Sequence, residues 1–208
     1  MQREEKSERS RRVVLDAALE LFSHQGYRGT SVREIADAAG VSTGNVYHHF
    51  PDKETIFQSL IQEYWTATES KRFPFTRALS AGAFPENIEQ LGYAARDSVR
   101  EYSRYVALMY VDVIEFEGKH IRNFYSEMGN RLMSTLDQQG ALEELKSQLR
   151  PSVSPATAML LTTRFFFTYF AVEVLFGVRE PFGMDSRLLV QEIADILRYG
   201  MLKTGEKG

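Results

Sequence analysis

The sequence predicts an all-α protein in which a small N-terminal group of helices is followed by a larger helical bundle. Apolar residues recur at the three- and four-residue spacing of a helix face, and no useful stretch alternates apolar and polar residues as a strand does. Glycine and proline fall between the periodic segments, where they mark helix ends.

Composition limits the classes of protein that fit. Of the 208 residues, 43% are hydrophobic and 25% are charged, as in ordinary globular proteins. The formal net charge of −3 argues against a surface that binds polyanions everywhere, but it leaves room for a local basic patch. The absence of cysteine excludes disulfides, thiolate metal sites and cysteine nucleophiles. We expect a cytoplasmic protein without a metal site, a cofactor or catalytic residues.

Four helices are predicted in the N-terminal third, over residues 10–24, 31–38, 43–49 and 53–71. Each begins at or directly after a residue whose side chain can accept a hydrogen bond from a free backbone N–H of the first turn: Ser10, Ser31, Ser42 and Asp52. Ser31 is followed three residues later by Glu34, the pattern of a capping box. Gly26 ends the first helix.

The second and third helices, with the turn Ala39-Gly40-Val41 between them, predict a helix-turn-helix. Gly40 tolerates the positive φ that the turn needs, and the third helix then presents polar residues at its start, as a helix that reads a DNA groove does. We expect residues 1–53, including an N-terminal arm, to form a DNA-binding domain. Its predicted contact residues are Ser31, Arg33, Ser42, Thr43, Gly44, Asn45, Tyr47, His48 and Lys53.

Several of these residues have a plainer interpretation. Asn45 and Arg33 fit a solvated surface as well as a DNA contact, and Tyr47 fits a core position. Residues 1–53 hold eight basic and eight acidic side chains, so this domain lacks the excess of positive charge typical of DNA-binding domains. We therefore expect modest affinity for DNA of arbitrary sequence.

A long ordered pattern in this region resembles the N-terminal domain of the tetracycline-repressor (TetR/AcrR) family. It spans residues 11–57 without a gap and includes Gly26-Tyr27, Thr30-Ser31-Val32, Ile35-Ala36, Ala39-Gly40-Val41-Ser42, Gly44, Val46-Tyr47-His48-His49-Phe50 and Lys53-Glu54. The resemblance implies an all-helical homodimer, DNA contacts from the third helix, and release from an operator when a ligand binds. Family members resemble one another little over residues 74–208, so it implies no role for individual residues there.

Further helices are predicted over residues 86–116, with a break near Tyr102, and over 118–137, 141–149, 155–176 and 186–203. Residues 158–178 are apolar enough for a membrane span. However, they include Arg164 and Glu173, and charges are costly at the centre of a bilayer. We therefore expect this segment to be a buried helix, and no membrane contact.

Residues 54–208 are expected to bind a ligand and to form the dimer. They are rich in aromatic and methionine side chains, which often only fill a core, but the number exceeds what a bundle needs. A bulky, largely apolar small molecule is the predicted ligand. The candidate lining residues are Tyr105, Met109, Phe116, His120, Phe124, Arg164, Phe167 and Phe170.

The last two long helices are expected to pair with those of a second copy. The family resemblance implies this, and the helix over 155–176 is apolar on nearly every side, so one of its faces needs a partner. The candidate interface residues are Phe166, Tyr169, Val174, Leu189, Ile193 and Ile196. Such a dimer binds a near-palindromic stretch of double-stranded DNA.

Two other classes of function stay open at this point. In the first, the chain binds DNA but is controlled by a protein partner rather than by a small ligand. The second is a helical enzyme. The sequence offers it no glycine-rich phosphate loop and no cluster of histidines and carboxylates at metal-ligand spacing.

Overall fold

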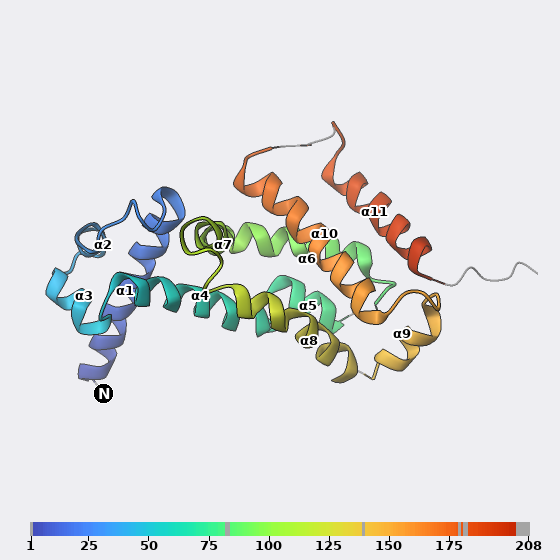
Figure 1. Cartoon of the computed structure of the whole chain (residues 1–208), viewed down its shortest axis with the longest axis horizontal. Coiled ribbons are helices and arrows are strands. Elements are labelled where there is room, and N and C mark those ends of the chain that lie inside the picture. The colour runs from blue at the N-terminus through green and yellow to red at the C-terminus, as the bar shows by residue number, and fades with distance from the viewer. Residues whose placement is uncertain (1, 82–83, 139, 179, 181–182, 203–208) are drawn as a thin grey trace, which may run out of the picture. The chain divides into compact units, whose positions relative to one another are not determined.

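The computed structural model describes residues 2–81, 84–138, 140–178, 180 and 183–202. Over these residues the regular elements are helices, which confirms the predicted all-α class (Figure 1). The chain divides into two compact units. The first combines the residues up to Thr66 with Arg104–Asn123, and the second combines Ala67–Ser103 with the residues from Phe124 onward.

The first unit contains α1 (Gln2–Gln25), α2 (Val32–Ala39), α3 (Thr43–His49), most of α4 (Lys53–Glu69) and most of α7 (Ser103–Phe116). Helices α2 and α3 both pack against α1 (Figure 1). The apolar faces meet in a core that includes Phe22, Ile35, Val46, Phe50 and Phe57. Burial of this core fixes the angle between α2 and α3.

Of the four helices predicted in the N-terminal third, three start where the capping residues indicated. Ser31 and Ser42 are the N-caps of α2 and α3, and Asp52 Oδ1 accepts the backbone N–H of Thr55 at 2.7 Å in the first turn of α4. The prediction for α1 is wrong at its start. Ser10 lies inside the helix, which begins at Gln2, so the expected N-terminal arm is helical.

The second unit contains α5 (Pro74–Ala81), α6 (Ile88–Glu101), most of α8 (Arg122–Gln138), α9 (Leu142–Gln148), α10 (Pro155–Leu175) and α11 (Ser186–Met201). Helix α6 is its centre and packs against α5, α10 and α11. Gly92 allows this close approach. A Cβ at Gly92 would lie 2.8 Å from Val190 Cγ1 and 3.0 Å from the ring of Phe166.

One helix and one helix boundary differ from those expected after residue 70. Helix α5 was not predicted, because a short segment that starts with proline carries little periodic signal. Helix α8 begins at Arg122 rather than near residue 118, because Glu117 (φ 56°) and Gly118 (φ 75°) form a left-handed turn. The predicted break near Tyr102 is confirmed, since α6 ends at Glu101 and α7 begins at Ser103.

Helix α10 is long and apolar enough to cross a membrane, and 39% of its most apolar window is buried. The expected burial of this helix therefore holds for one face within its own unit, and the other apolar face is exposed. Met159, Phe166 and Phe170 are in the core, whereas Leu160 and Leu161 are exposed. A core helix whose exposed face is also apolar has the same length and composition as a helix that spans a membrane.

Candidate nucleic-acid interface

Helix α3 is a short capped rod with one buried and one exposed face. Ser42 Oγ accepts the backbone N–H of Asn45 at 3.1 Å and so satisfies a free donor of the first turn. Val46 is buried, while Thr43 and Gly44 are exposed and Tyr47 keeps 55% of its surface accessible. His48 is exposed as well. The polar face predicted to contact DNA is therefore the solvent face of α3.

Helix α2 is held at its start by the predicted capping box. Ser31 Oγ accepts the N–H of Glu34 at 3.2 Å, and Glu34 Oε2 accepts the N–H of Ser31 at 2.7 Å. The Ser31 hydroxyl also donates to Glu34 Oε2 at 2.7 Å, and this bond, together with the one from the Ser31 N–H, holds the pKa of the Glu34 carboxyl below its ordinary value. Arg33 is largely exposed, with its Nε 3.9 Å from Asp37 Oδ2. Its guanidinium therefore faces solvent.

The turn between α2 and α3 has the predicted geometry. Gly40 adopts φ 66° and ψ 32°, the left-handed conformation that glycine takes without steric cost. Its N–H and that of Val41 return to carbonyls of α2, at Asp37 (3.2 Å) and Ala36 (3.0 Å). Ile35 and Ala36 are buried against the rest of the unit, so the two helices are fixed relative to each other.

Asn45 is tied to α1 rather than fully free. Ser10 donates its hydroxyl hydrogen to Asn45 Oδ1 at 2.7 Å, across 35 residues of sequence. Asn45 is therefore half-buried, and its side-chain NH₂ is the group that remains to face outward. No pattern in the sequence indicated this contact, since Ser10 was expected to cap α1.

The structure gives Lys53 a different role from the phosphate contact that was expected. Its ammonium donates to the backbone carbonyls of Tyr27 at 2.7 Å and Thr30 at 2.6 Å, and lies 4.0 Å from the centre of the Tyr27 ring. Burial lowers the pKa of Lys53, against the opposing effect of the carboxylates of Glu115 and Glu34. Lys53 is thus a bridge inside the unit, and we leave it out of the proposed DNA contacts.

The N-terminal region matches a known family. Residues 14–60 fit the family model described as "Bacterial regulatory proteins, tetR family". The chain is 46% identical over 66 residues to the HTH-type transcriptional regulator AcrR of Shigella flexneri, which is 32% of this chain and 29% of AcrR. It is 44% identical over 54 residues to the transcriptional repressor KstR2 of Rhodococcus jostii, 26% of each chain. Over residues 14–60, the N-terminal segment of this chain therefore matches the TetR family in sequence.

The matched sequence thus spans under a third of these curated relatives, but the fold is shared over a greater length. The solved structure of NalD from Pseudomonas aeruginosa, described as the secondary repressor of a multidrug efflux pump, aligns with 95% of this chain and 98% of its own. The TM-score is 0.65 at 22% sequence identity. KstR2 of Mycobacterium tuberculosis aligns with a TM-score of 0.58, also at 22% identity. At this identity the likeness concerns the fold. The named relatives are all regulators or repressors, and the enzyme alternative gains no support from them.

Outside the TetR-family segment, the eight candidate ligand-lining residues divide between the two units. Tyr105, Met109, Phe116 and His120 lie in the first, and Phe124, Arg164, Phe167 and Phe170 lie in the second. Several have side-chain partners. Tyr105 stacks on Tyr64, Arg164 lies over Tyr125, and Phe167 packs edge-on against Phe75. The cavity expected among them stays a prediction.

Two of the candidate ligand-lining residues, His120 and Tyr105, take part in internal hydrogen bonds. His120 Nδ1 lies 2.5 Å from an oxygen of the fully buried Asp112, and its Nε2 lies 3.2 Å from Glu54 Oε1 on α4. Tyr105 donates its hydroxyl hydrogen to Glu63 at 3.2 Å. Burial, and then the nearby Glu63 carboxylate, raise the pKa of Tyr105 to about 12. These contacts stabilise the unit whether or not a ligand binds.

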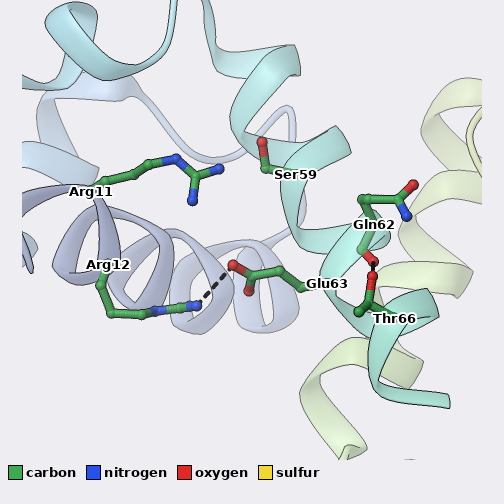
Figure 2. Close-up of a pocket in the computed structure, with 6 residues that line it drawn as sticks. All are labelled: Arg11, Arg12, Ser59, Gln62, Glu63 and Thr66. Atoms are coloured by element: carbon green, nitrogen blue, oxygen red, sulfur yellow. Dashed lines mark hydrogen bonds and ion pairs between the residues drawn. The ribbon is translucent and has the colours of Figure 1, made fainter. Parts of the chain in front are cut away.

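An open cleft of about 510 Å³ lies between α1 and α4, next to the TetR-family helices (Figure 2). It is lined by Arg11, Arg12, Ser59, Gln62, Glu63 and Thr66. Figure 2 shows both arginines reaching from α1 toward α4, where Arg12 meets Glu63 at 2.8 Å. None of the candidate ligand residues lines this cleft.

The candidate dimer residues differ in exposure. Ile196 on α11 is 65% exposed, whereas Phe166 on α10 is 1% exposed and packs beside Gly92. Phe166 therefore cannot be offered to a partner, and we leave it out of the proposed interface. Tyr169, Val174, Leu189 and Ile193 are half-buried. Further exposed apolar residues on these two helices are Leu160, Leu161, Leu188 and Tyr199.

Proposed function

We propose that this chain is a transcriptional regulator that binds double-stranded DNA through α3. The observation that carries the proposal is the pair of faces on α3. Val46 is buried and Ser42 caps the helix, while Thr43, Gly44 and Tyr47 project into solvent from a rod held at a fixed angle to α2. A rod of this size fits the major groove. The match to the TetR family supports the same function.

We further propose that the chain acts as a homodimer on a near-palindromic site. The outer faces of α10 and α11 support this proposal, because Leu161, Ile196 and Tyr199 are large apolar residues that are at least half exposed. Apolar exposure of this kind is typical of a surface covered by a partner. A two-fold dimer places two reading helices about 34 Å apart, or a multiple of that distance.

We also propose that the chain is a repressor and that a bulky apolar small molecule releases it from DNA. The aromatic content of the second unit supports this, because Phe73 and Phe75 both lie against Phe167 of α10. Proteins of the same fold are described as a ketosteroid regulator and a fatty acid degradation regulator. A protein partner in place of a small ligand is the alternative.

Selection from a library of random duplexes tests DNA binding. We expect the purified full chain to enrich a near-palindromic sequence and to bind it far more tightly than a shuffled duplex. Affinity should fall steeply between about 50 and 200 mM salt. A chain that enriches no sequence contradicts the proposal. Tyr47→Ala should weaken binding to the enriched and shuffled duplexes alike, because a phosphate contact carries no sequence information.

The dimer and the ligand need separate measurements. Ile196→Glu should shift the full chain toward the monomer in analytical ultracentrifugation and reduce DNA affinity with it. Glu192→Gln, at an exposed polar site on the same helix, is the control.

Mass spectrometry of the protein purified under native conditions, followed by a DNA-release assay with sterols and fatty acids, tests the ligand. Release by a protein fraction alone favours the alternative.

A further inference from the structure

The loop between α1 and α2 has backbone donors that no helix satisfies. Gly26 ends α1 in the left-handed conformation (φ 79°), and its N–H still returns to Phe22 at 3.1 Å. The next two N–H groups both meet one carboxylate from α7. Tyr27 donates to Glu115 Oε1 at 3.0 Å, and Arg28 donates to Glu115 Oε2 at 2.7 Å. Hydrogen bonds to an ionised acceptor are stronger than neutral ones.

The approach of this carboxylate depends on glycine. A Cβ at Gly26 would lie 2.5 Å from Glu115 Oε1, closer than real contacts allow. Glu115 is itself largely covered, with 14% of its side chain accessible. The neighbouring Phe116 packs on the Tyr27 ring with centroids 4.5 Å apart. The last turn of α7 therefore holds the loop by both polar and apolar contacts.

Lys53 secures the carbonyl groups of the same loop. Its ammonium binds the carbonyls of Tyr27 and Thr30, so the loop lies between a carboxylate that takes its N–H groups and a cation that takes its C=O groups. Thr30 is buried and donates its hydroxyl hydrogen to the carbonyl of Gly26 at 2.8 Å. The bonds made by Glu115, Lys53 and Thr30 therefore hold the loop between α1 and α2 in one conformation.

The loop leads directly into the helix-turn-helix. Thr30 precedes Ser31, which caps α2, and α2 sets the position of α3 through Gly40 and the buried Ile35. A displacement of the loop therefore displaces the start of α2. Glu115 is 83 residues beyond Val32 in sequence, yet it contacts the segment that positions this helix.

We propose that Glu115 is a positioning residue for DNA recognition, acting through the α1–α2 loop. It holds the backbone N–H groups of Tyr27 and Arg28, and thereby fixes where α2 and α3 present the contact face. The inference rests on the proposed DNA-binding function and adds a residue on α7 that touches no DNA.

The test uses the full chain and a duplex that the unmodified protein has enriched from random sequence. Glu115→Ala removes both acceptors and should weaken binding about tenfold, whereas Glu115→Gln keeps one acceptor and should weaken it about threefold. A loss of DNA affinity distinguishes the positioning role from a simple change of charge. Removal of a negative charge alone should leave DNA affinity unchanged or raise it, and Glu143→Gln, an exposed carboxylate on α9, measures that effect.

Two further readouts separate positioning from general destabilisation. Amide hydrogen exchange at Tyr27 and Arg28 should accelerate in both Glu115 variants, while that of buried residues such as Leu60 and Leu91 stays slow. The slope of log affinity against log salt concentration should not change, because Glu115 contacts no phosphate. Glu115→Gln keeps the shape of the side chain, so it remains informative if the alanine variant folds poorly.

The outcomes are distinguishable. If the unmodified chain enriches no duplex, the proposed function fails, and the exchange data alone decide whether Glu115 holds the loop. If it does enrich a duplex and Glu115→Ala binds that duplex as tightly, the positioning role is overturned while the proposed function stands. Equal losses in Glu115→Gln and Glu143→Gln overturn the positioning role as well.

Discussion

The hydroxyl of Ser10 on α1 donates to the side-chain oxygen of Asn45 on α3 at 2.7 Å. The bond orients the amide of a residue that lies on the proposed contact face. Because Oδ1 is occupied, Asn45 offers its NH₂ group as a donor to base acceptors in the major groove. Preference for the base beneath Asn45 therefore depends on α1 as well as on α3.

Asn45→Ala should change the sequence preference by about 1–3 kcal/mol at one base position in each half-site. Ser10→Ala should broaden the preference at the same position by less, because it frees the amide to rotate without removing it. Fluorescence anisotropy with single-base-substituted duplexes measures both. Uniform weakening on every duplex would instead identify Asn45 as a backbone contact.

Lys53→Met should destabilise the folded chain by about 2–3 kcal/mol, because two carbonyls lose a charged donor. The slope of log affinity against log salt concentration should stay the same, since the ammonium is bound inside the unit. Urea unfolding monitored by circular dichroism gives the stability. Lys146→Met, at a more exposed ion pair on α9, is the control and should change little. A flatter salt slope for Lys53→Met would restore the phosphate role.

Stability should fall in acid through Glu54. Its hydrogen bonds from Lys119, and then from His120, hold the pKa of the Glu54 carboxyl below its ordinary value. A carboxyl whose pKa is lower in the folded state stabilises the fold above its unfolded pKa, and this contribution is lost as the pH falls through the folded value. Urea midpoints should therefore decline below about pH 5, and less steeply in Glu54→Gln. Parallel profiles for the two proteins would count against this assignment.

Gly92→Ala should destabilise the second unit by about 1–3 kcal/mol, even though alanine favours helix formation. The new methyl would lie 2.8 Å from Val190 Cγ1 and 3.0 Å from Phe166. Gly129→Ala on α8 is a matched control, because nothing lies within 4 Å of its Cβ position. It should stabilise by up to about 1 kcal/mol. Thermal unfolding of the two variants should move in opposite directions.

Local features were predictable from sequence, because their partners lie within a few residues. The capping box of Ser31 and Glu34 and the glycine turn at Gly40 depend on spacings of three or four residues. The same reasoning could not find the internal partners of Lys53 and Asn45. Lys53 meets carbonyls 23 and 26 residues away, and Asn45 meets a hydroxyl 35 residues away. Neither spacing leaves a periodic signal.

For the apolar helices of the second half, buried and exposed residues were harder to tell apart from the sequence. Because α10 is apolar on nearly every side, periodicity could not separate Phe166, which lies in the core, from Leu161, which lies on the surface. Glu115 was missed for a different reason. A single carboxylate near the end of a helix looks like any solvated residue until the fold brings it to Tyr27 and Arg28.

Because the Lys53 amine is covered, its rate of acylation should report opening of the loop between α1 and α2. Two carbonyls and the Tyr27 ring cover the ammonium, so an acylating reagent should modify exposed lysines such as Lys119 and Lys146 first. Lys53 becomes reactive only when the surrounding loop opens. Peptide mapping after brief acylation can therefore follow that opening in unlabelled protein, with DNA present or absent.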